Sequence, residues 1–165
     1  MNTFFIKRNK NKLTPYILLL LGFTLPFGVI ATDLKSKQVI RSEIKERKAA
    51  FSLMQRYYAR LKGAIEQVPL TQVNQSLLAD ARSLLFMSQE VQKMFQTDVA
   101  KNEFRSKAKD GIWDNLAAFN HEMNDYVART ALLLNKLENN NTTSFKQDVS
   151  DLGQTCKSCH KQYKN

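Results

Sequence analysis

The spacing of its apolar residues is the feature of this 165-residue chain that most restricts its fold. After residue 31 the apolar side chains recur at steps of three and four residues, which places them on one face of a helix. No stretch shows the sustained alternation of apolar and polar residues that marks a half-buried strand. The chain holds only five Gly and three Pro, and much of the rest is Leu, Ala, Lys, Gln and Glu. These are good helix formers, so we expect an all-α protein.

Four amphipathic segments are separated by polar or turn-forming stretches. Their expected bounds are about Leu34 to Gln67, about Val73 to Phe95, from an N-cap at Asp110 to a break at Asn139–Asn141, and from caps at Thr142, Thr143 and Ser144 to Tyr163. The charged stretch 96–110 is expected to be a crossover between the second and third helices. Four helices of this length with mostly short connections pack best as an antiparallel bundle.

The N-terminus has the pattern of an export signal. A positive segment at residues 7–12 precedes an almost entirely apolar stretch at 18–30, which is short for a transmembrane span. A signal-peptidase site after Ala31 fits the pattern, so residues 1–31 are predicted to be a signal peptide and residues 32–165 a domain in the periplasm. An uncleaved signal would instead tether the domain to the outer face of the inner membrane.

The charge balance weakens a nucleic-acid interpretation of the sequence pI near 9.7. Four of the positive charges lie in the predicted signal, so the formal net charge of +10 falls to +6 without it. The remaining basic residues are spread along helices rather than clustered, and we expect no nucleic-acid partner. No nucleophile–base pair, phosphate loop or carboxylate dyad stands at readable spacing, so a dedicated hydrolase or transferase is not expected.

Two cysteines, Cys156 and Cys159, stand directly before His160 in a CxxCH motif. A thioredoxin-like disulfide is one interpretation, but that motif belongs to a βαβ context that the pattern lacks. A zinc site is another, but it would need His121 from a different helix as the fourth ligand. Covalent haem uses every residue of the motif: both thiols lie on one side of a helix for thioether formation, and His160 reaches the iron. We therefore predict one covalent haem c with His160 as its axial ligand.

Apolar side chains on the facing helices are candidates to line this haem. They are Phe51, Met54, Trp113 and Phe119. Ordinary core packing explains any one of them equally well. Because a haem brings a large apolar surface into a small core, the chain without it is expected to be poorly packed along these stripes.

With a CxxCH motif ending a fourth helix, the chain resembles the cytochrome c′ family (class II cytochromes c) over essentially the whole predicted mature domain. Three segments carry the resemblance: Arg47 followed four residues later by Phe51, the Ile112-Trp113 pair, and the stretch from Cys156 to Lys164. Cytochrome c′ is itself an example of the antiparallel four-helix bundle. Homodimers through the first two helices are common in the family, so the resemblance implies a homodimer here.

The resemblance implies a role for each matching residue. Arg47 would pair with a haem propionate, Phe51 would lie over the distal face of the iron, and Lys164 would flank His160 on the proximal side. Phenylalanine has no lone pair, so the iron would be five-coordinate. A pocket without hydrogen-bond donors favours nitric oxide and carbon monoxide over dioxygen, which agrees with the family's association with nitric oxide binding.

A low-spin electron carrier of the cytochrome c-556 type remains the alternative within the same fold. In that type a methionine on the first helix binds the sixth position of the iron. Met54 lies one turn from Phe51 and could serve, although it reads equally well as core. Either protein would exchange electrons with small redox partner proteins.

Overall fold

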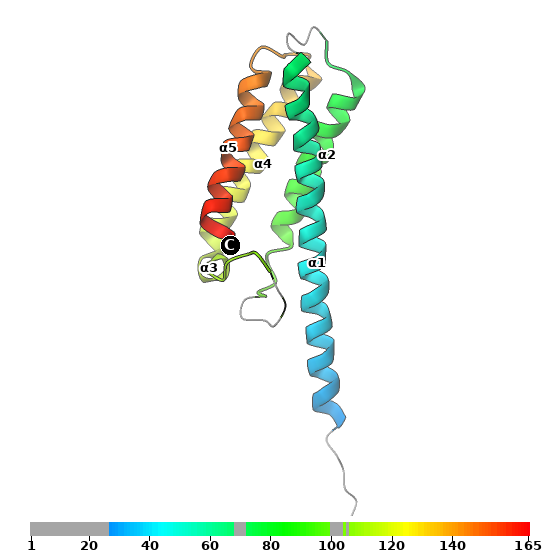
Figure 1. Ribbon diagram of the computed structural model, residues 1–165, viewed down its shortest axis with the longest axis vertical. Coiled ribbons are helices and arrows are strands. Elements are labelled where there is room, and N and C mark those ends of the chain that lie inside the picture. Colours follow the sequence, from blue (N-terminus) through cyan, green and yellow to red (C-terminus); the bar gives the residue numbers. More distant parts are fainter. Residues whose placement is uncertain (1–26, 68–71, 100–103, 105) are drawn as a thin grey trace, which may run out of the picture.

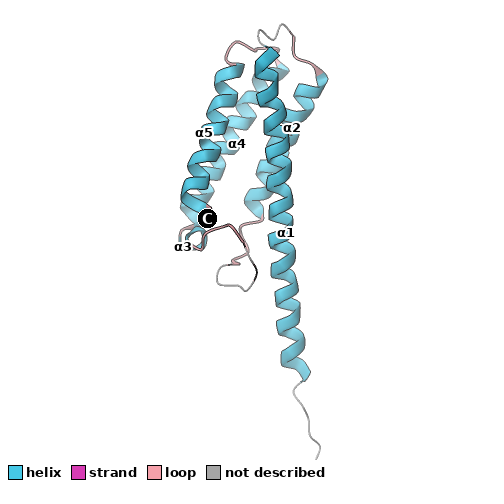
Figure 2. Cartoon of the chain, in the orientation of Figure 1, coloured by secondary structure: helices cyan, strands magenta, loops and turns pink. Residues whose placement is uncertain are grey.

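The computed structural model describes residues 27–67, 72–99, 104 and 106–165. Its helices are α1 (Phe27–Ala64), the 3-10 turn Ile65–Gln67, α2 (Gln75–Lys93), α3 (Gly111–Asp114), α4 (Leu116–Glu138) and α5 (Phe145–Tyr163). The four long helices run alternately up and down (Figure 1). The described residues contain helices and loops without a strand (Figure 2), which confirms the predicted all-α four-helix bundle.

The long helices pack in a ring, in which α1 contacts α2, α2 contacts α4, α4 contacts α5, and α5 returns to α1. Of these four interfaces, the one between α5 and α1 is the least extensive. The core is one cluster of side chains at helical spacing, and its fully buried members include Leu61, Leu84, Ile112, Phe119, Leu133, Leu137, Phe145, Val149 and Leu152. None of the helices in the described part of the chain combines the length and the hydropathy needed to span a bilayer.

Helix α1 begins at Phe27, earlier than the predicted start at Leu34. Residues 1–26 of the predicted signal lie outside the described residues. Cleavage after Ala31 therefore stays a prediction.

The predicted third helix is divided at Asn115. Asp110, the expected N-cap, has helical backbone angles and makes no side-chain cap hydrogen bond. The backbone leaves the helical region at Asn115 (φ −143°, ψ 67°), and its Oδ1 accepts a hydrogen bond from the Ala118 N–H at 3.1 Å. Asp110 is the N-cap residue of the short helix α3, as predicted, but the prediction of one continuous helix was wrong, because Asn115 supplies the oxygen that starts the long helix α4.

Asn115→Ala is expected to lower the free energy of unfolding by about 1 kcal/mol, because α4 loses the acceptor for one of its free N–H groups. Asp110→Ala has no cap bond to lose, so a change below about 0.5 kcal/mol is expected. Urea unfolding of both variants measures the difference. Equal losses in the two variants would contradict this account of the α4 N-terminus.

The crossover loop, residues 106–110, is fastened to the C-terminal end of α5. The Lys109 N–H donates to the Tyr163 carbonyl at 2.9 Å, and the Asn165 N–H donates to the Lys107 carbonyl at 2.8 Å. Ala108 and Lys164 form an isolated antiparallel β-bridge between these two bonds. The charged crossover is therefore held against the helix end that carries the CxxCH motif.

Candidate functional site

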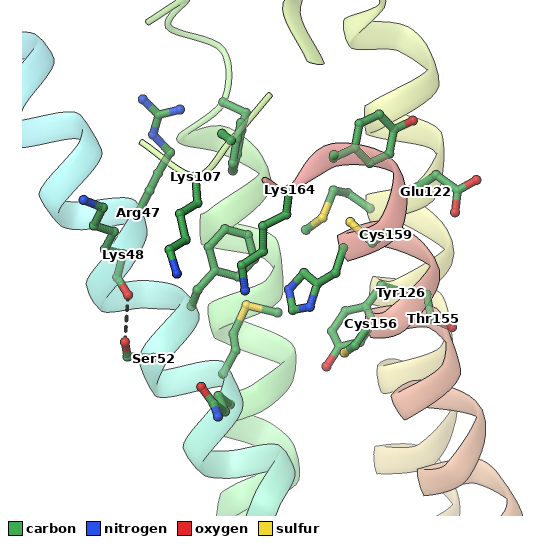
Figure 3. A pocket seen from close by; sticks show the side chains of 18 of the residues that line it. Arg47, Lys48, Ser52, Lys107, Glu122, Tyr126, Thr155, Cys156, Cys159 and Lys164 are labelled. Carbon is green, nitrogen blue, oxygen red and sulfur yellow. Dashed lines mark hydrogen bonds between the residues drawn. The ribbon is translucent and has the colours of Figure 1, made fainter. Parts of the chain in front are cut away.

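A cavity of about 1000 Å³ lies between α1 and the α4–α5 pair, closed at one end by the crossover loop. Its volume suits a large organic ligand. Most of the predicted site residues line it, namely Arg47, Phe51, Met54, Phe119, Cys156, Cys159, His160 and Lys164. In Figure 3, Cys156 and Cys159 lie on the α5 side, while Arg47 and Lys48 lie across from them on α1.

The two thiols stand one turn apart on α5, and both are free and half-buried. Burial raises the pKa of Cys156 and raises the pKa of Cys159 to about 11. A hydrogen bond with the Tyr126 hydroxyl partly offsets the effect of burial on the pKa of Cys156. Both sulfurs therefore carry their protons at neutral pH when no group is bound to them.

His160 follows Cys159 at the cavity edge. Desolvation lowers its pKa, and the positive charge of Lys164, four residues later, lowers it further. The imidazole is therefore neutral at pH 7, the form in which a ring nitrogen can bind a metal. His121 is exposed on α4 and is not among the lining residues, so it does not join the cysteines in a zinc site.

Arg47 is only 4% exposed. Its Cζ lies 4.9 Å from the centroid of the Phe95 ring and 5.5 Å from that of Trp113, and its Nε donates to the Glu43 carbonyl at 3.3 Å. Burial lowers the pKa of the guanidinium, although the Glu43 charge opposes this. Nη1 and Nη2 are buried and have no hydrogen-bond partner among the described residues. Because unpaired buried charge is costly, these two nitrogens fit a carboxylate such as a haem propionate.

The α1 wall opposite the cysteines is apolar where it faces inward. Phe51 is half-buried and packs edge-on against Phe95, with ring centroids 6.1 Å apart. Met54 is 7% exposed and belongs to the core cluster. Ser52 also lines the cavity, but its hydroxyl is exposed and donates to the Lys48 carbonyl at 2.9 Å.

Trp113 differs from the prediction, because it is not among the residues that line the cavity. Its ring stacks on Phe95 at 6.1 Å and its Nε1–H donates to the Phe95 carbonyl at 3.2 Å. Trp113 therefore contacts Arg47, which lines the cavity, and does not line the cavity itself. Helical periodicity identifies the face that a residue occupies, but it does not say how many side chains stand between that residue and a ligand.

Several lining residues were not singled out from the sequence. They are Tyr58, Phe95, Lys107, Glu122, Met123 and Tyr126. The apolar stripes predicted from the sequence include Phe95, Met123 and Tyr126. Periodicity therefore predicted that these residues are buried, but it did not relate them to a ligand. Lys107 carries no periodic signal, since only the backbone pairing with Asn165 brings it to the cavity.

Comparison with known proteins identifies the family. A family model described as Cytochrome C′ matches residues 42–164, which is most of the chain. Comparison with curated protein sequences gives no match. The matched range includes Arg47, Phe51 and the CxxCH motif.

Solved structures of similar fold are cytochromes c′. The structure from Shewanella frigidimarina has 21% identity and a TM-score of 0.67, covering 76% of this chain and 96% of that one. The Rubrivivax gelatinosus structure has 19% identity and a TM-score of 0.65, covering 74% and 94%. A nitrosyl complex of an Alcaligenes xylosoxidans variant has 18% identity and a TM-score of 0.66, covering 76% and 97%.

Haem c is the cofactor of this family, and Cys156, Cys159 and His160 stand at the spacing of its attachment motif. The cavity, its two thiols, the neutral imidazole and the unpaired Arg47 nitrogens fit such a group. The chain belongs to the cytochrome c′ family.

Proposed function

We propose that this chain is a periplasmic cytochrome with one haem c, which binds small neutral gases such as nitric oxide and carbon monoxide and exchanges electrons. The observation that carries the proposal is the contrast between the two cavity walls. The α5 wall presents two thiols and an imidazole, whereas the α1 wall includes the phenyl ring of Phe51 and, among its described residues, has no histidine or cysteine. When bound, the haem supplies an iron that can change oxidation state and take up a diatomic ligand.

The chain's own residues hold and orient the cofactor. Cys156 and Cys159 would fix the macrocycle to α5 through two thioethers, and His160 would bind the iron through its neutral imidazole. Arg47 meets one propionate with Nη1 and Nη2, which removes the cost of an unpaired buried guanidinium. Burial is the main cause of the lowered pKa of His160, and the positive charge of the nearby Lys164 lowers it further.

Phe51, which lines the α1 wall, has a side chain with neither a lone pair to bind an iron nor a hydrogen bond to donate. Bound dioxygen needs such a donor to stabilise its partial negative charge, whereas nitric oxide and carbon monoxide depend on it less. The apolar environment of Phe51 and Met54 therefore favours the neutral gases. The nitric oxide complexes of cytochrome c′ from Alcaligenes xylosoxidans support this reading by analogy.

A low-spin electron carrier is the second candidate, because Met54 also lines the cavity and its thioether is a possible sixth ligand. Absorption spectra of the oxidised and reduced holoprotein, with and without nitric oxide and carbon monoxide, separate the two. We expect a high-spin ferrous form that binds carbon monoxide, with the same spectra in Met54→Leu. Met123→Leu is the matched control, since Met123 lines the cavity from α4.

The opposite outcome is a methionine–sulfur charge-transfer band in the ferric protein that disappears in Met54→Leu but persists in Met123→Leu. That result would replace the gas-binding proposal with the electron-carrier alternative. It would leave the haem attachment through Cys156 and Cys159 unaffected.

The periplasmic location rests on the export-signal pattern at residues 1–31. We expect the full chain, expressed in a Gram-negative host, to appear in the periplasmic fraction with Thr32 as its first residue. Recovery of the uncleaved chain with the membrane fraction would show that the signal is retained as an anchor.

A homodimer through α1 and α2 is part of the proposal. The exposed large apolar side chains Val39 and Leu53 lie on α1, and Phe86, which is 59% exposed, lies on α2. Burial of these side chains against a second copy would be favourable. Sedimentation equilibrium of the holoprotein tests this, and a monomer at all concentrations would contradict it.

A further inference from the structure

A haem c carries two propionate carboxylates, and a bidentate contact through Nη1 and Nη2 of Arg47 would engage one of them. The Nε of Arg47 already donates to the Glu43 carbonyl, which leaves Nη1 and Nη2 as the free pair. A guanidinium binds one carboxylate with two parallel hydrogen bonds. The second carboxylate therefore needs another cation, and the structure offers one that the family comparison does not assign.

Lys107 lines the cavity from the crossover loop, not from a helix. Its carbonyl accepts a hydrogen bond from the Asn165 N–H, and the following residue, Ala108, is bridged to Lys164. Figure 3 shows its side chain extending between α1 and α5, in the space between Arg47 and Lys164. Among the described residues its ammonium has no hydrogen-bond or ion-pair partner. The backbone of Lys107 is thus held in place while its charge remains available.

The other cations at the cavity have different surroundings. Lys164 is adjacent to His160 and acts on its pKa. Lys48 stands beside Arg47 on α1, and Lys62 lines the cavity from the last turn of α1. Among the described residues, Glu122 is the only acidic side chain that lines the cavity, so the lining as a whole is positive. A positive lining of this kind suits a dianionic group.

We propose that Lys107 binds the second haem propionate, so that α1 and the crossover loop hold the two carboxylates from separate elements. This inference rests on the proposed haem site. A cation at this position also favours the ferrous state, because the reduced haem carries one positive charge fewer than the oxidised haem.

The test uses holoprotein carrying Lys107→Gln, Lys107→Glu or Lys107→Arg. Lys109→Gln is the matched control, since its ammonium belongs to the same loop but donates to the Lys161 carbonyl at 3.1 Å and does not line the cavity. Resonance Raman spectra report the propionate bending modes. Redox titration at low and high ionic strength reports the midpoint potential.

In Lys107→Gln we expect shifted propionate bending modes. We also expect a lower midpoint potential, because the cation that favours the ferrous haem is gone. At a fixed applied potential, the ferric-to-ferrous ratio should rise about three- to tenfold. Lys107→Glu should lower the potential further, and Lys107→Arg should restore the wild-type modes. The differences should shrink as salt is added, because Lys107 is exposed.

Unchanged modes and potential in Lys107→Gln and Lys107→Glu would overturn the inference. Equal changes in Lys109→Gln would overturn it as well, because the effect would then come from the loop structure. Neither outcome touches the proposed haem site, whose failure would appear as absent haem stain in the wild-type chain.

Discussion

The Cys156→Ala/Cys159→Ala double variant is expected to lose all haem stain on a denaturing gel and to lose the native packing of the bundle. Both side chains line the cavity that the cofactor fills, and they are the only cysteines in the chain. Without thioethers, no haem survives denaturation. The stain therefore tests the attachment directly.

The structural loss follows from the size of the cavity. An unfilled space of about 1000 Å³ leaves the apolar side chains that line it in contact with water instead of with the cofactor, which is unfavourable. A domain of this size has about 5 to 15 kcal/mol of stability in total. The walls therefore collapse or separate in the double variant, and we expect weak near-UV circular dichroism with partly retained helical signal.

His121→Ala is the control, since His121 is exposed on α4 outside the cavity. It should keep both the stain and the wild-type melting curve. Covalent haem in the double variant would show that the attachment site lies elsewhere. A native-like melting curve without haem would show that the cavity does not depend on the cofactor.

Arg47→Met is expected to destabilise the holoprotein and to have little effect without haem. In the holoprotein it removes the partner of a propionate, so the free energy of unfolding should fall by about 3 kcal/mol. In the haem-free double variant no propionate is present, and the loosened packing gives water access to Nη1 and Nη2, which have no partner in the described structure. The substitution should therefore change the free energy of unfolding of that variant by less than about 0.5 kcal/mol.

Urea unfolding followed by circular dichroism measures both effects. Arg56→Met is the matched control, because Arg56 is exposed on the same helix, and it should change either background by less than about 0.5 kcal/mol. Destabilisation by Arg47→Met in both backgrounds would mean that the arginine stabilises the bundle through its contacts with Phe95 and Trp113 alone.

The helices and most of the site could be predicted from the sequence because both depend on local spacing. Arg47 and Phe51 are four residues apart, and a helix places such a pair on one face. Cys156 and Cys159 are three apart, with the same result. Such spacing within one helix does not depend on how the helices pack together. The structure places all four residues on the cavity wall.

The features that the sequence did not predict depend on distant parts of the chain. The position of Lys107 depends on backbone pairing with Asn165, 58 residues later in the numbering. Trp113 packs against Arg47 and Phe95, which line the cavity, and does not line the cavity itself. Asparagine is a favoured N-cap residue. However, the apolar spacing continues through Ile112 and Leu116, so it predicted one helix across Asn115, where the structure has a break.

The interface between α5 and α1 is the least extensive of the four, and the cavity lies between these two helices. A haem held by Cys156, Cys159 and His160 would supply contacts between them that direct side-chain packing does not. Amides of α5 should therefore depend on the cofactor for protection from hydrogen exchange, whereas those between α1 and α2 are protected by direct packing. A substitution that strengthens the contacts of α1 with the haem should then also slow the separation of α5 from the bundle.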